Sequence, residues 1–182
     1  MIKILVTGVF ASGKTSLVSS LKSELENAGK KVAVFSEVAR DCPLDLNLEQ
    51  NPVSTSWLVM RQVRNEIELV DGNYDFIIFD RGIPDIIAHT KYTLKDNQEE
   101  QWFYDELEKL GKASLNNFHY VFLSKRSDKF IIEIDGMRLN DINYQKNLEE
   151  IHRNYLDKQS VEFTTLVEKN SDRLGQILSL II

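Results

Sequence analysis

Short apolar runs recur along the chain and alternate with longer amphipathic segments. An apolar run of a few residues is typical of a strand that is buried on both faces of a parallel sheet. The pattern predicts strands at residues 2–6, 31–36, 76–79, 120–123 and 161–165. Because no internal repeat or long linker interrupts this pattern, we expect one domain over residues 1–182.

The segments between these runs show the spacing of amphipathic helices. Leu17, Leu21 and Leu25 share one face of the first segment, and Gly29 supplies a stop just after it. The predicted helices cover residues 14–27, 55–70, 98–110, 142–158 and 172–180. Since parallel strands are joined by helical crossovers, the alternation predicts a three-layer α/β fold around a parallel sheet.

Charge and cysteine content narrow the classes of protein that fit. A net charge of −6 argues against a large nucleic-acid-binding surface, which needs clustered Lys and Arg. Cys42 is the only cysteine, so no internal disulfide can form and a reducing compartment fits. The sequence shows neither a signal peptide nor an apolar run of membrane-spanning length, and we therefore expect a cytoplasmic protein.

The junction of the first strand and the first helix carries the strongest motif. Residues 8–15, GVFASGKT, match the phosphate-binding pattern G-x-x-x-x-G-K-T in the strand-to-helix context that the pattern requires. Glycines allow the loop to wrap a phosphate with its N–H groups inward, and the helix N-terminus favours the same anion. The nucleotide-binding residues are predicted to be Gly8, Ala11, Ser12, Gly13, Lys14, Thr15 and Ser16.

The motifs of a GTP-hydrolysing switch are missing from this sequence. The third predicted strand ends in Asp80-Arg81-Gly82, and Ile83 occupies the position where D-x-x-G requires glycine. After the fourth strand the chain reads SKRS, where a guanine-binding N-K-x-D would be expected. The sequence therefore favours transfer of a phosphoryl group to a small molecule over a GTPase switch.

Charged pairs follow the second and third predicted strands. Glu37 and Arg40 come after the second strand, and Asp80 and Arg81 end the third. The carboxyl ends of parallel strands lie at one edge of the sheet, where ligands bind, so we expect these side chains to gather beside the phosphate loop. The alternatives are an i,i+3 ion pair on a solvated helix start and a simple strand-end turn.

Together the stretches GVFASGKT, SEVAR, FIIFDRGIPD and DGMR resemble the P-loop small-molecule kinases. The resemblance spans nearly the whole chain. It is closest to the group with the nicotinamide-riboside-kinase domain of bifunctional NAD-biosynthesis regulators and their AAA-domain relatives. Deoxynucleoside and thymidylate kinases are similar but more distant. The resemblance implies a P-loop NTPase fold with a five-stranded parallel sheet in the order 2-3-1-4-5, ATP with Mg²⁺, and an arginine-bearing lid.

Phosphoryl transfer needs charge neutralisation and in-line positioning more than covalent chemistry. We assign Lys14 to the outer phosphates, and Thr15 and Asp80 to Mg²⁺. Resemblance to deoxynucleoside kinases implies that Glu37 is the base for the acceptor hydroxyl. Two alternatives stay open: Glu37 and Asp80 exchange roles, or the acceptor is already a phosphate and Glu37 binds a sugar hydroxyl.

Arginines are the remaining candidates for contact with the reacting groups. Arg40 and Arg81 are expected to reach the acceptor or the transferred phosphoryl group. By resemblance, residues 124–140 form a lid in which Arg126 and Arg138 close over the nucleotide and the transition-state charge. The alternating apolar residues 130–134 allow a hairpin as the other interpretation of this segment.

The second long helix, 55–70, is the candidate wall of the acceptor pocket. Trp57, Arg61 and Gln62 are predicted to contact a flat ring on a sugar, because aromatic, guanidinium and amide groups suit such a ligand. The alternative has Trp57 packed in the core and the arginine in solvent. The histidines lack metal-binding spacing and are interpreted as structural.

The leading functional prediction is ATP-dependent phosphorylation of a small nucleoside-like acceptor, of the nucleoside or nicotinamide riboside type. A second enzymatic hypothesis is a nucleoside-monophosphate or polynucleotide 5′-end kinase, although the acidic composition disfavours nucleic acid. A third is an ATP-binding regulatory module with little kinase activity. No membrane partner is expected, and a homodimer is left open.

Overall fold

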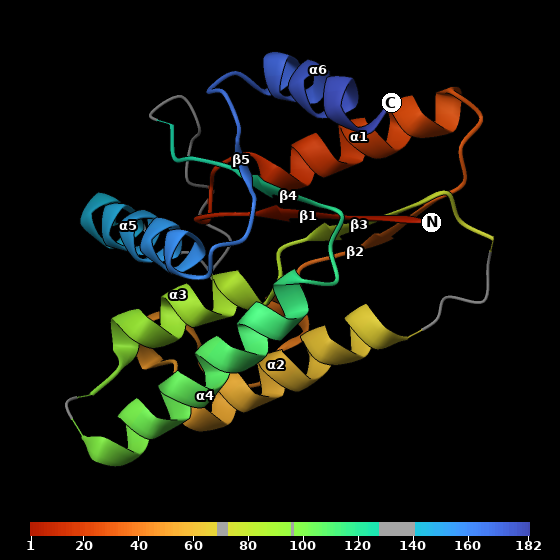
Figure 1. The fold of residues 1–182 in the computed structure, drawn as a ribbon. Helices are drawn as coiled ribbons and strands as arrows, with labels where there is room; N and C mark the ends of the chain where they lie inside the picture. The colour runs from red at the N-terminus through yellow and green to blue at the C-terminus, as the bar shows by residue number, and fades with distance from the viewer. Residues whose placement is uncertain (69–72, 96, 128–140) are drawn as a thin grey trace.

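Five parallel strands form the centre of the fold (Figure 1). The structure is a computed structural model that describes residues 1–68, 73–95, 97–127 and 141–182. The strands are β1 (Ile2–Thr7), β2 (Val32–Phe35), β3 (Phe76–Asp80), β4 (Tyr120–Leu123) and β5 (Thr164–Thr165). Their order is β2-β3-β1-β4-β5, and every pairing is parallel. The predicted sheet and its strand order are confirmed.

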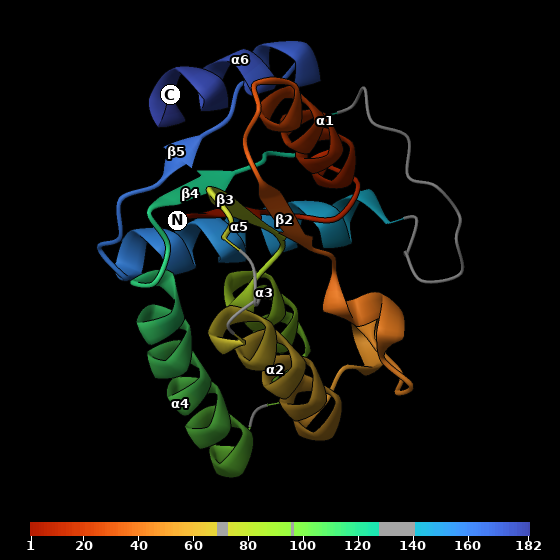
Figure 2. The same cartoon turned by 90° about the vertical axis from the view of Figure 1, so that its right-hand side faces the viewer.

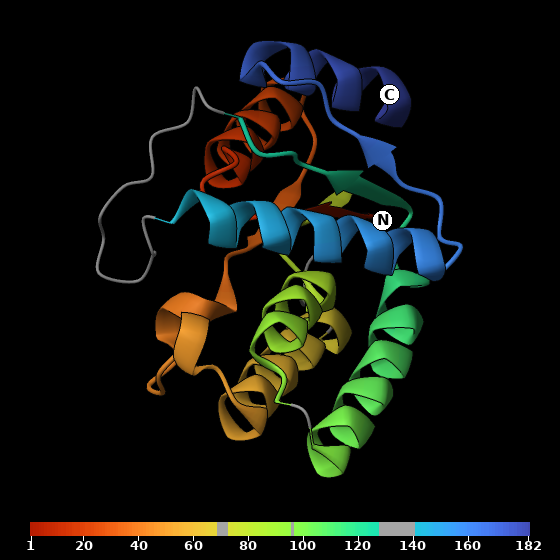
Figure 3. The same ribbon diagram turned by 90° about the vertical axis from the view of Figure 1, so that its left-hand side faces the viewer.

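Six helices cover the two faces of this sheet among the described residues. They are α1 (Lys14–Asn27), α2 (Pro52–Ile67), α3 (Ile83–Thr93), α4 (Gln98–Leu115), α5 (Ile142–Lys158) and α6 (Asn170–Ile181). Figure 2 shows α1 and α6 on one side of the sheet and α2, α3 and α4 on the other. Figure 3 shows that α5 runs along the same side as α3. The three-layer α/β prediction is therefore confirmed.

Alternate residues of the central strand serve the two faces. Ile4 and Val6 of β1 pack with the apolar faces of α1 and α6. Leu5 packs with residues of α3, α4 and α5 in a second cluster. All three side chains are fully buried. Because both faces are covered at its centre, β1 has an unbroken apolar run at residues 4–6, which is why its strand was detectable from sequence.

The helix α3 was not predicted, and several predicted boundaries were wrong, including the start of β5 at Thr164 in place of residue 161. The α3 sequence, IPDIIAHTKYT, is apolar around much of its circumference because α3 packs against α2, α4 and α5. An amphipathic stripe is therefore absent. Helix α2 begins at Pro52, three residues before the predicted start, because Asn51 caps it by accepting from Val53 and Ser54 N–H. Helix α4 continues beyond 110 to Leu115.

Some predictions fall outside the described residues. The predicted lid, 124–140, and its hairpin alternative lie there except for 124–127, and Arg138 lies there as well. The end of the helix predicted at 55–70 also lies partly in the undescribed segment 69–72. Within the described ranges, no helix combines the length and apolarity needed to span a membrane.

Two helical glycines provide a matched test of the packing on the α3 side. A Cβ at Gly111 of α4 would overlap the Tyr155 hydroxyl and the Ile87 side chain, whereas a Cβ at Gly175 of α6 would meet open space. We expect Gly111→Ala to lower the free energy of unfolding by about 1–3 kcal/mol through overpacking. Gly175→Ala should raise it by up to about 1 kcal/mol through helix propensity. Urea denaturation of both variants checks this, and equal effects of the two substitutions would contradict the packing.

Candidate functional site

The loop between β1 and α1 has a backbone that its glycines make possible. Gly8 and Gly13 adopt φ angles of 134° and 78°, and Ala11 between them has a φ of 52°. A side chain at Gly8 would also overlap the carbonyl of Ser124 at the end of β4. Gly8 therefore allows the loop to lie directly against the neighbouring strand end. Ser16 is exposed in the first turn of α1.

Lys14 is folded inward along the loop that contains it. Its Nζ donates to the carbonyls of Gly8 (2.5 Å) and Val9 (2.7 Å), and the residue is only 3% exposed. Burial, and then the positive charge of Arg81, lower the pKa of Lys14 to about 7. A phosphate anion in the loop would add a negative charge beside Lys14 and raise that pKa. This environment fits the predicted role of Lys14, which stays a prediction.

Thr15 and Asp80 meet at the edge of the sheet, as their predicted metal-binding role requires. The Thr15 hydroxyl donates to Asp80 Oδ2 at 2.7 Å. The other oxygen, Oδ1, is buried and accepts no hydrogen bond from the described residues. No group of three His, Cys, Asp or Glu side chains suited to a metal occurs in the described ranges. This pair fits Mg²⁺, which typically takes one or two protein oxygens and completes its shell with phosphate and water.

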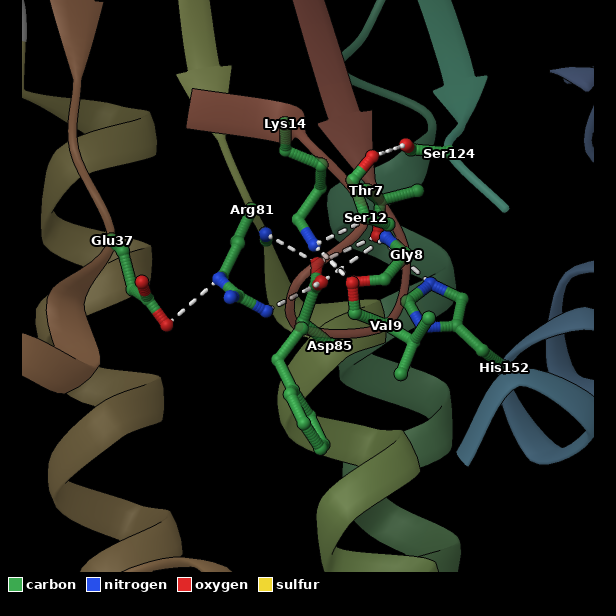
Figure 4. A network of polar contacts seen from close by, with 12 residues as sticks. Thr7, Gly8, Val9, Ser12, Lys14, Glu37, Arg81, Asp85, Ser124 and His152 are labelled. Atoms are coloured by element: carbon green, nitrogen blue, oxygen red, sulfur yellow. Dashed lines mark hydrogen bonds and ion pairs between the residues drawn. The ribbon is translucent and has the colours of Figure 1, made fainter. Parts of the chain in front are cut away.

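Asp85 is the centre of a polar network that the sequence analysis did not assign (Figure 4). Its carboxylate accepts from Thr7 Oγ1 (2.6 Å), Gly82 N (2.9 Å) and Gly8 N (3.2 Å). Burial alone would raise its pKa, but the neighbouring His152, the positive charges of Lys14 and Arg81 and the Thr7 hydrogen bond hold it below its usual range. Asp85 therefore joins the start of α3 to the start of the phosphate loop. The signal available in the sequence was Pro84 followed by an acid in a helix's first turn.

Helix α5 contacts the same loop through two polar side chains. His152 Nε2 lies 2.8 Å from Thr7 Oγ1, and Gln145 Nε2 donates to the Phe10 carbonyl at 2.8 Å. Because Thr7 gives its only proton to Asp85, His152 must donate from Nε2. Burial, ahead of the charges of Lys14 and Arg81, lowers the pKa of His152 to about 4 despite the nearby Asp85. The imidazole is thus neutral and holds the loop in place.

Arg173 of α6 holds the loop from the opposite side, and the sequence offered no signal for it. Its guanidinium donates to the Ser12 carbonyl (2.5 Å), to the Ser124 hydroxyl (2.9 Å) and to the carbonyls of Val167 and Lys125. The side chain is fully buried. Arg173 therefore connects the phosphate loop to the ends of β4 and β5.

Arg81 lies between two carboxylates at the carboxyl end of β3 (Figure 4). Its Nε is 2.8 Å from Glu37 Oε1, and its Nη1 is 3.7 Å from Asp85 Oδ1. Arg40 also pairs with Glu37, at 3.6 Å. Burial alone would lower the pKa of Arg81, but the carboxylates of Glu37, Asp85 and Asp80 raise it above its ordinary value. Arg81 has a φ of 79°, which is uncommon for a residue with a side chain and is a kind of backbone strain that clusters at functional sites.

A cavity of about 280 Å³ opens beside this ion-pair cluster. Four of the predicted acceptor residues are among those that line it, namely Glu37, Arg40, Gln62 and Arg81. Asp85, Gln50 and His89 line it as well and were not predicted.

Two predicted acceptor residues do not line this cavity. Trp57 is half-buried and packs against the apolar cluster formed by Val38, Leu58 and Ile86. Arg61 lies 3.9 Å from Asp41 in an ion pair. For Trp57 the geometry therefore matches the core alternative. Arg126 is half-buried after the end of β4, and Arg138 lies outside the described part of the chain.

The strand order, the phosphate loop and the charged strand ends define a P-loop kinase-like fold. The chain belongs to the AAA domain family, whose sequence model matches residues 3–173. Among solved structures, it is similar to deoxyadenosine kinase from M. mycoides with the products dCMP and a flexible dCDP bound. The TM-score is 0.71 at 15% identity, with 99% of this chain and 98% of that chain covered.

A second similar structure is the NadR protein in complex with NR. The TM-score is 0.73 at 15% identity, with 99% of this chain covered. The match covers 50% of the NadR chain, so this protein spans about half of its length. No curated protein matches the sequence. At these identities the solved structures show the fold alone.

Buried neutral histidines make the fold sensitive to acid. Burial, and then the charge of Arg81, lower the pKa of His89 to about 4. Burial, and then the charge of Lys14, lower the pKa of His152 to about 4 as well. Both are ordinarily near 6.5 in an unfolded chain. The unfolded state therefore binds more protons between about pH 4 and 6.5, and stability falls as the pH drops through this window.

His152→Gln removes one of these groups while its amide retains a donor for Thr7. We expect the slope of unfolding free energy against pH to decrease by about 1 kcal/mol per pH unit near pH 5 to 6. Urea denaturation at several pH values measures this, with pH 8 as the internal reference where both imidazoles are neutral. An unchanged slope would show that His152 is already charged in the folded protein.

Proposed function

We propose that this protein transfers the γ-phosphoryl group of ATP to a hydroxyl of a small nucleoside-like acceptor. The observation that carries the proposal is the Glu37–Arg81 ion pair, which lines a cavity next to the phosphate loop. The pair places a carboxylate at the boundary between a donor site and a pocket for a second molecule. A nucleotide-binding regulatory module needs the loop but has no use for this second pocket.

The charges along the cavity favour an uncharged acceptor over a nucleotide. The described residues that line it include three carboxylates (Glu37, Asp45, Asp85) and two guanidinium groups (Arg40, Arg81). Both arginines already pair with Glu37. A phosphate monoester brings a charge of roughly −2 and would need unpaired cations. This balance supports a nucleoside rather than a nucleoside monophosphate.

The similar structures support a nucleoside-like acceptor in general. One is a deoxyadenosine kinase with dCMP as a product, and the other is the NadR protein in complex with NR. Their molecules fit the class of a ring on a sugar with a free hydroxyl. For this chain the same class supports the proposal without choosing among its members.

Each of the proposed catalytic residues has a separate role in the transfer. Glu37 accepts the proton of the acceptor hydroxyl, and the hydroxyl oxygen forms a bond to the γ-phosphorus as the bond to the β-bridging oxygen breaks. ADP leaves, and Glu37 returns its proton to solvent. Lys14 and the loop N–H groups stabilise the charge on the transferred group. Thr15 and Asp80 would hold Mg²⁺, which supplies further neutralisation of the phosphate charges.

The proposed function is tested by following ADP release from Mg-ATP with a panel of nucleosides, nucleotides and nicotinamide riboside. We expect ADP release to depend on a nucleoside or nicotinamide riboside. Release at one rate with every acceptor and with none would support the regulatory-module hypothesis instead. A requirement for nucleoside monophosphates would support the second enzymatic hypothesis.

Glu37→Gln tests the base directly. The amide keeps the size of the side chain and an oxygen that can face Arg81, but it takes no proton from the acceptor, so we expect kcat to fall by about a hundredfold or more. The KM for ATP should not change, because Glu37 lies on the acceptor side. Glu49→Gln, an exposed substitution of the same type in the nearby 3₁₀ helix 47–49, is the control. Full transfer activity in Glu37→Gln would rule out this base.

Asp80→Asn tests the metal site. The amide oxygen still accepts from Thr15, but the anionic ligand is lost. We therefore expect half-saturation by Mg²⁺ to rise by about tenfold or more. Titration of activity with Mg²⁺ measures this, and Asp157→Asn on exposed α5 surface controls for the change in net charge. The same Mg²⁺ dependence in Asp80→Asn and wild type would remove Asp80 from the metal site.

A further inference from the structure

Gln62 of α2 lines the cavity with an amide whose orientation is fixed from behind. Its Nε2 donates to Glu66 Oε1 at 3.0 Å, one helical turn further along α2. The other oxygen of Glu66 accepts from the Ser114 hydroxyl of α4 at 2.6 Å. Gln62 and Glu66 are 3% and 6% exposed. Both hydrogen bonds are therefore shielded from water.

A carboxylate that accepts at both oxygens determines which end of the neighbouring amide faces it. If the Gln62 amide turned over, its carbonyl oxygen would face Glu66 Oε1, and two acceptors would meet in a buried place. The observed orientation leaves Gln62 Oε1 with no hydrogen bond from the described residues. One N–H of the same amide is also left over. Gln62 therefore offers the cavity a carbonyl oxygen beside an N–H, in that fixed order.

Gln50 lies on another part of the cavity wall, and hydrogen bonds fix the orientation of its side-chain amide as well. The Thr90 hydroxyl donates to the Ile86 carbonyl, so it can only accept from its other neighbours. Thr55 then donates to Thr90, and both hydroxyls accept from Gln50 Nε2, at 3.1 and 2.9 Å. The carbonyl oxygen of Gln50 remains, with no hydrogen bond from the described residues. The cavity thus presents a second acceptor.

We propose that Glu66 is a positioning residue that sets acceptor specificity, by holding Gln62 with its carbonyl oxygen ready for an amino group on the ring of the acceptor. The inference rests on the proposed function and names its substrate class: nucleosides whose base carries an exocyclic amino group next to a ring acceptor. Cytosine and adenine have this arrangement. Uracil and hypoxanthine carry an oxygen in place of the amino group and a ring N–H in place of the acceptor.

An oxo base would meet the fixed amide with both partners reversed. Its carbonyl oxygen would face Gln62 Oε1, and its ring N–H would face the remaining amide N–H. Sites built to hydrogen-bond one group discriminate strongly against an analogue that leaves buried polar groups unpaired. We therefore expect wild-type kcat/KM to favour cytidine over uridine, and adenosine over inosine, by at least about tenfold.

The experiment measures kcat/KM with Mg-ATP for these four nucleosides, in ribose and deoxyribose forms. Glu66→Gln keeps the shape of the side chain. The new amide can either accept a hydrogen bond from Gln62 or donate one to it, so the Gln62 amide can turn over. We expect the amino/oxo ratio to fall toward one in Glu66→Gln and in a second variant, Glu66→Met. Ser114→Ala is the matched control, because it removes a hydrogen bond from the same carboxylate and leaves the Glu66–Gln62 contact intact. Its ratio should equal that of wild type.

Three outcomes would overturn this inference while the proposed function stands. One is a wild-type enzyme that phosphorylates the amino and oxo partners equally well. Another is a uniform loss of kcat/KM for all four nucleosides in both Glu66 variants, with the ratio preserved, which would make Glu66 structural only. A wild-type protein that phosphorylates nicotinamide riboside but none of these nucleosides would likewise overturn this inference alone, whereas no phosphorylation of any of these acceptors would overturn the proposed function as well.

Discussion

The guanidinium of Arg81 lies between two carboxylates, and the rest of the site depends on this placement. On one side Glu37 reaches it from the end of β2, and on the other Asp85 reaches it from the first turn of α3. Asp85 in turn holds the first residues of the phosphate loop. A single charge at the end of β3 therefore links the loop to the neighbouring cavity. Burial makes the link strong, because an unpaired charge there would be costly.

The phosphate loop is held from three helices that are distant in sequence. Asp85 of α3, His152 and Gln145 of α5, and Arg173 of α6 all bond to its backbone or to Thr7. Their bonds to backbone groups fix the path of the loop, so its N–H groups need little reorganisation when an anion binds. Such preorganisation is the main source of electrostatic stabilisation in phosphoryl transfer.

Features of the fold and the site could be predicted from the sequence where a local pattern of residues indicates them. The loop motif, the buried strands and the charges at strand ends are short-range patterns, and they located the sheet edge that gathers Glu37, Arg40 and Arg81. Helix α3 was missed because burial on several sides removes the periodicity that marks a helix.

Residues that act through tertiary contacts had no local signal. Arg173 reads as an ordinary polar residue of a surface helix until α6 is seen beside the phosphate loop. Trp57 illustrates the reverse case, since its spacing on α2 allowed both a ligand contact and core packing, and the side chain packs on an apolar cluster. Which face of a helix meets a pocket depends on the neighbouring elements, and the sequence does not specify them one by one.

If the proposed function is right, the cavity beside Arg81 holds the phosphate acceptor. The most direct measurement is a crystal structure with Mg²⁺, an unreactive ATP analogue and a nucleoside that stimulates ADP release. We expect the nucleoside in this cavity, with its hydroxyl within about 2.6–3.2 Å of a Glu37 oxygen. The same hydroxyl should lie about 3–3.5 Å from the γ-phosphorus. A nucleoside bound elsewhere, or a hydroxyl out of reach of Glu37, would contradict this expectation.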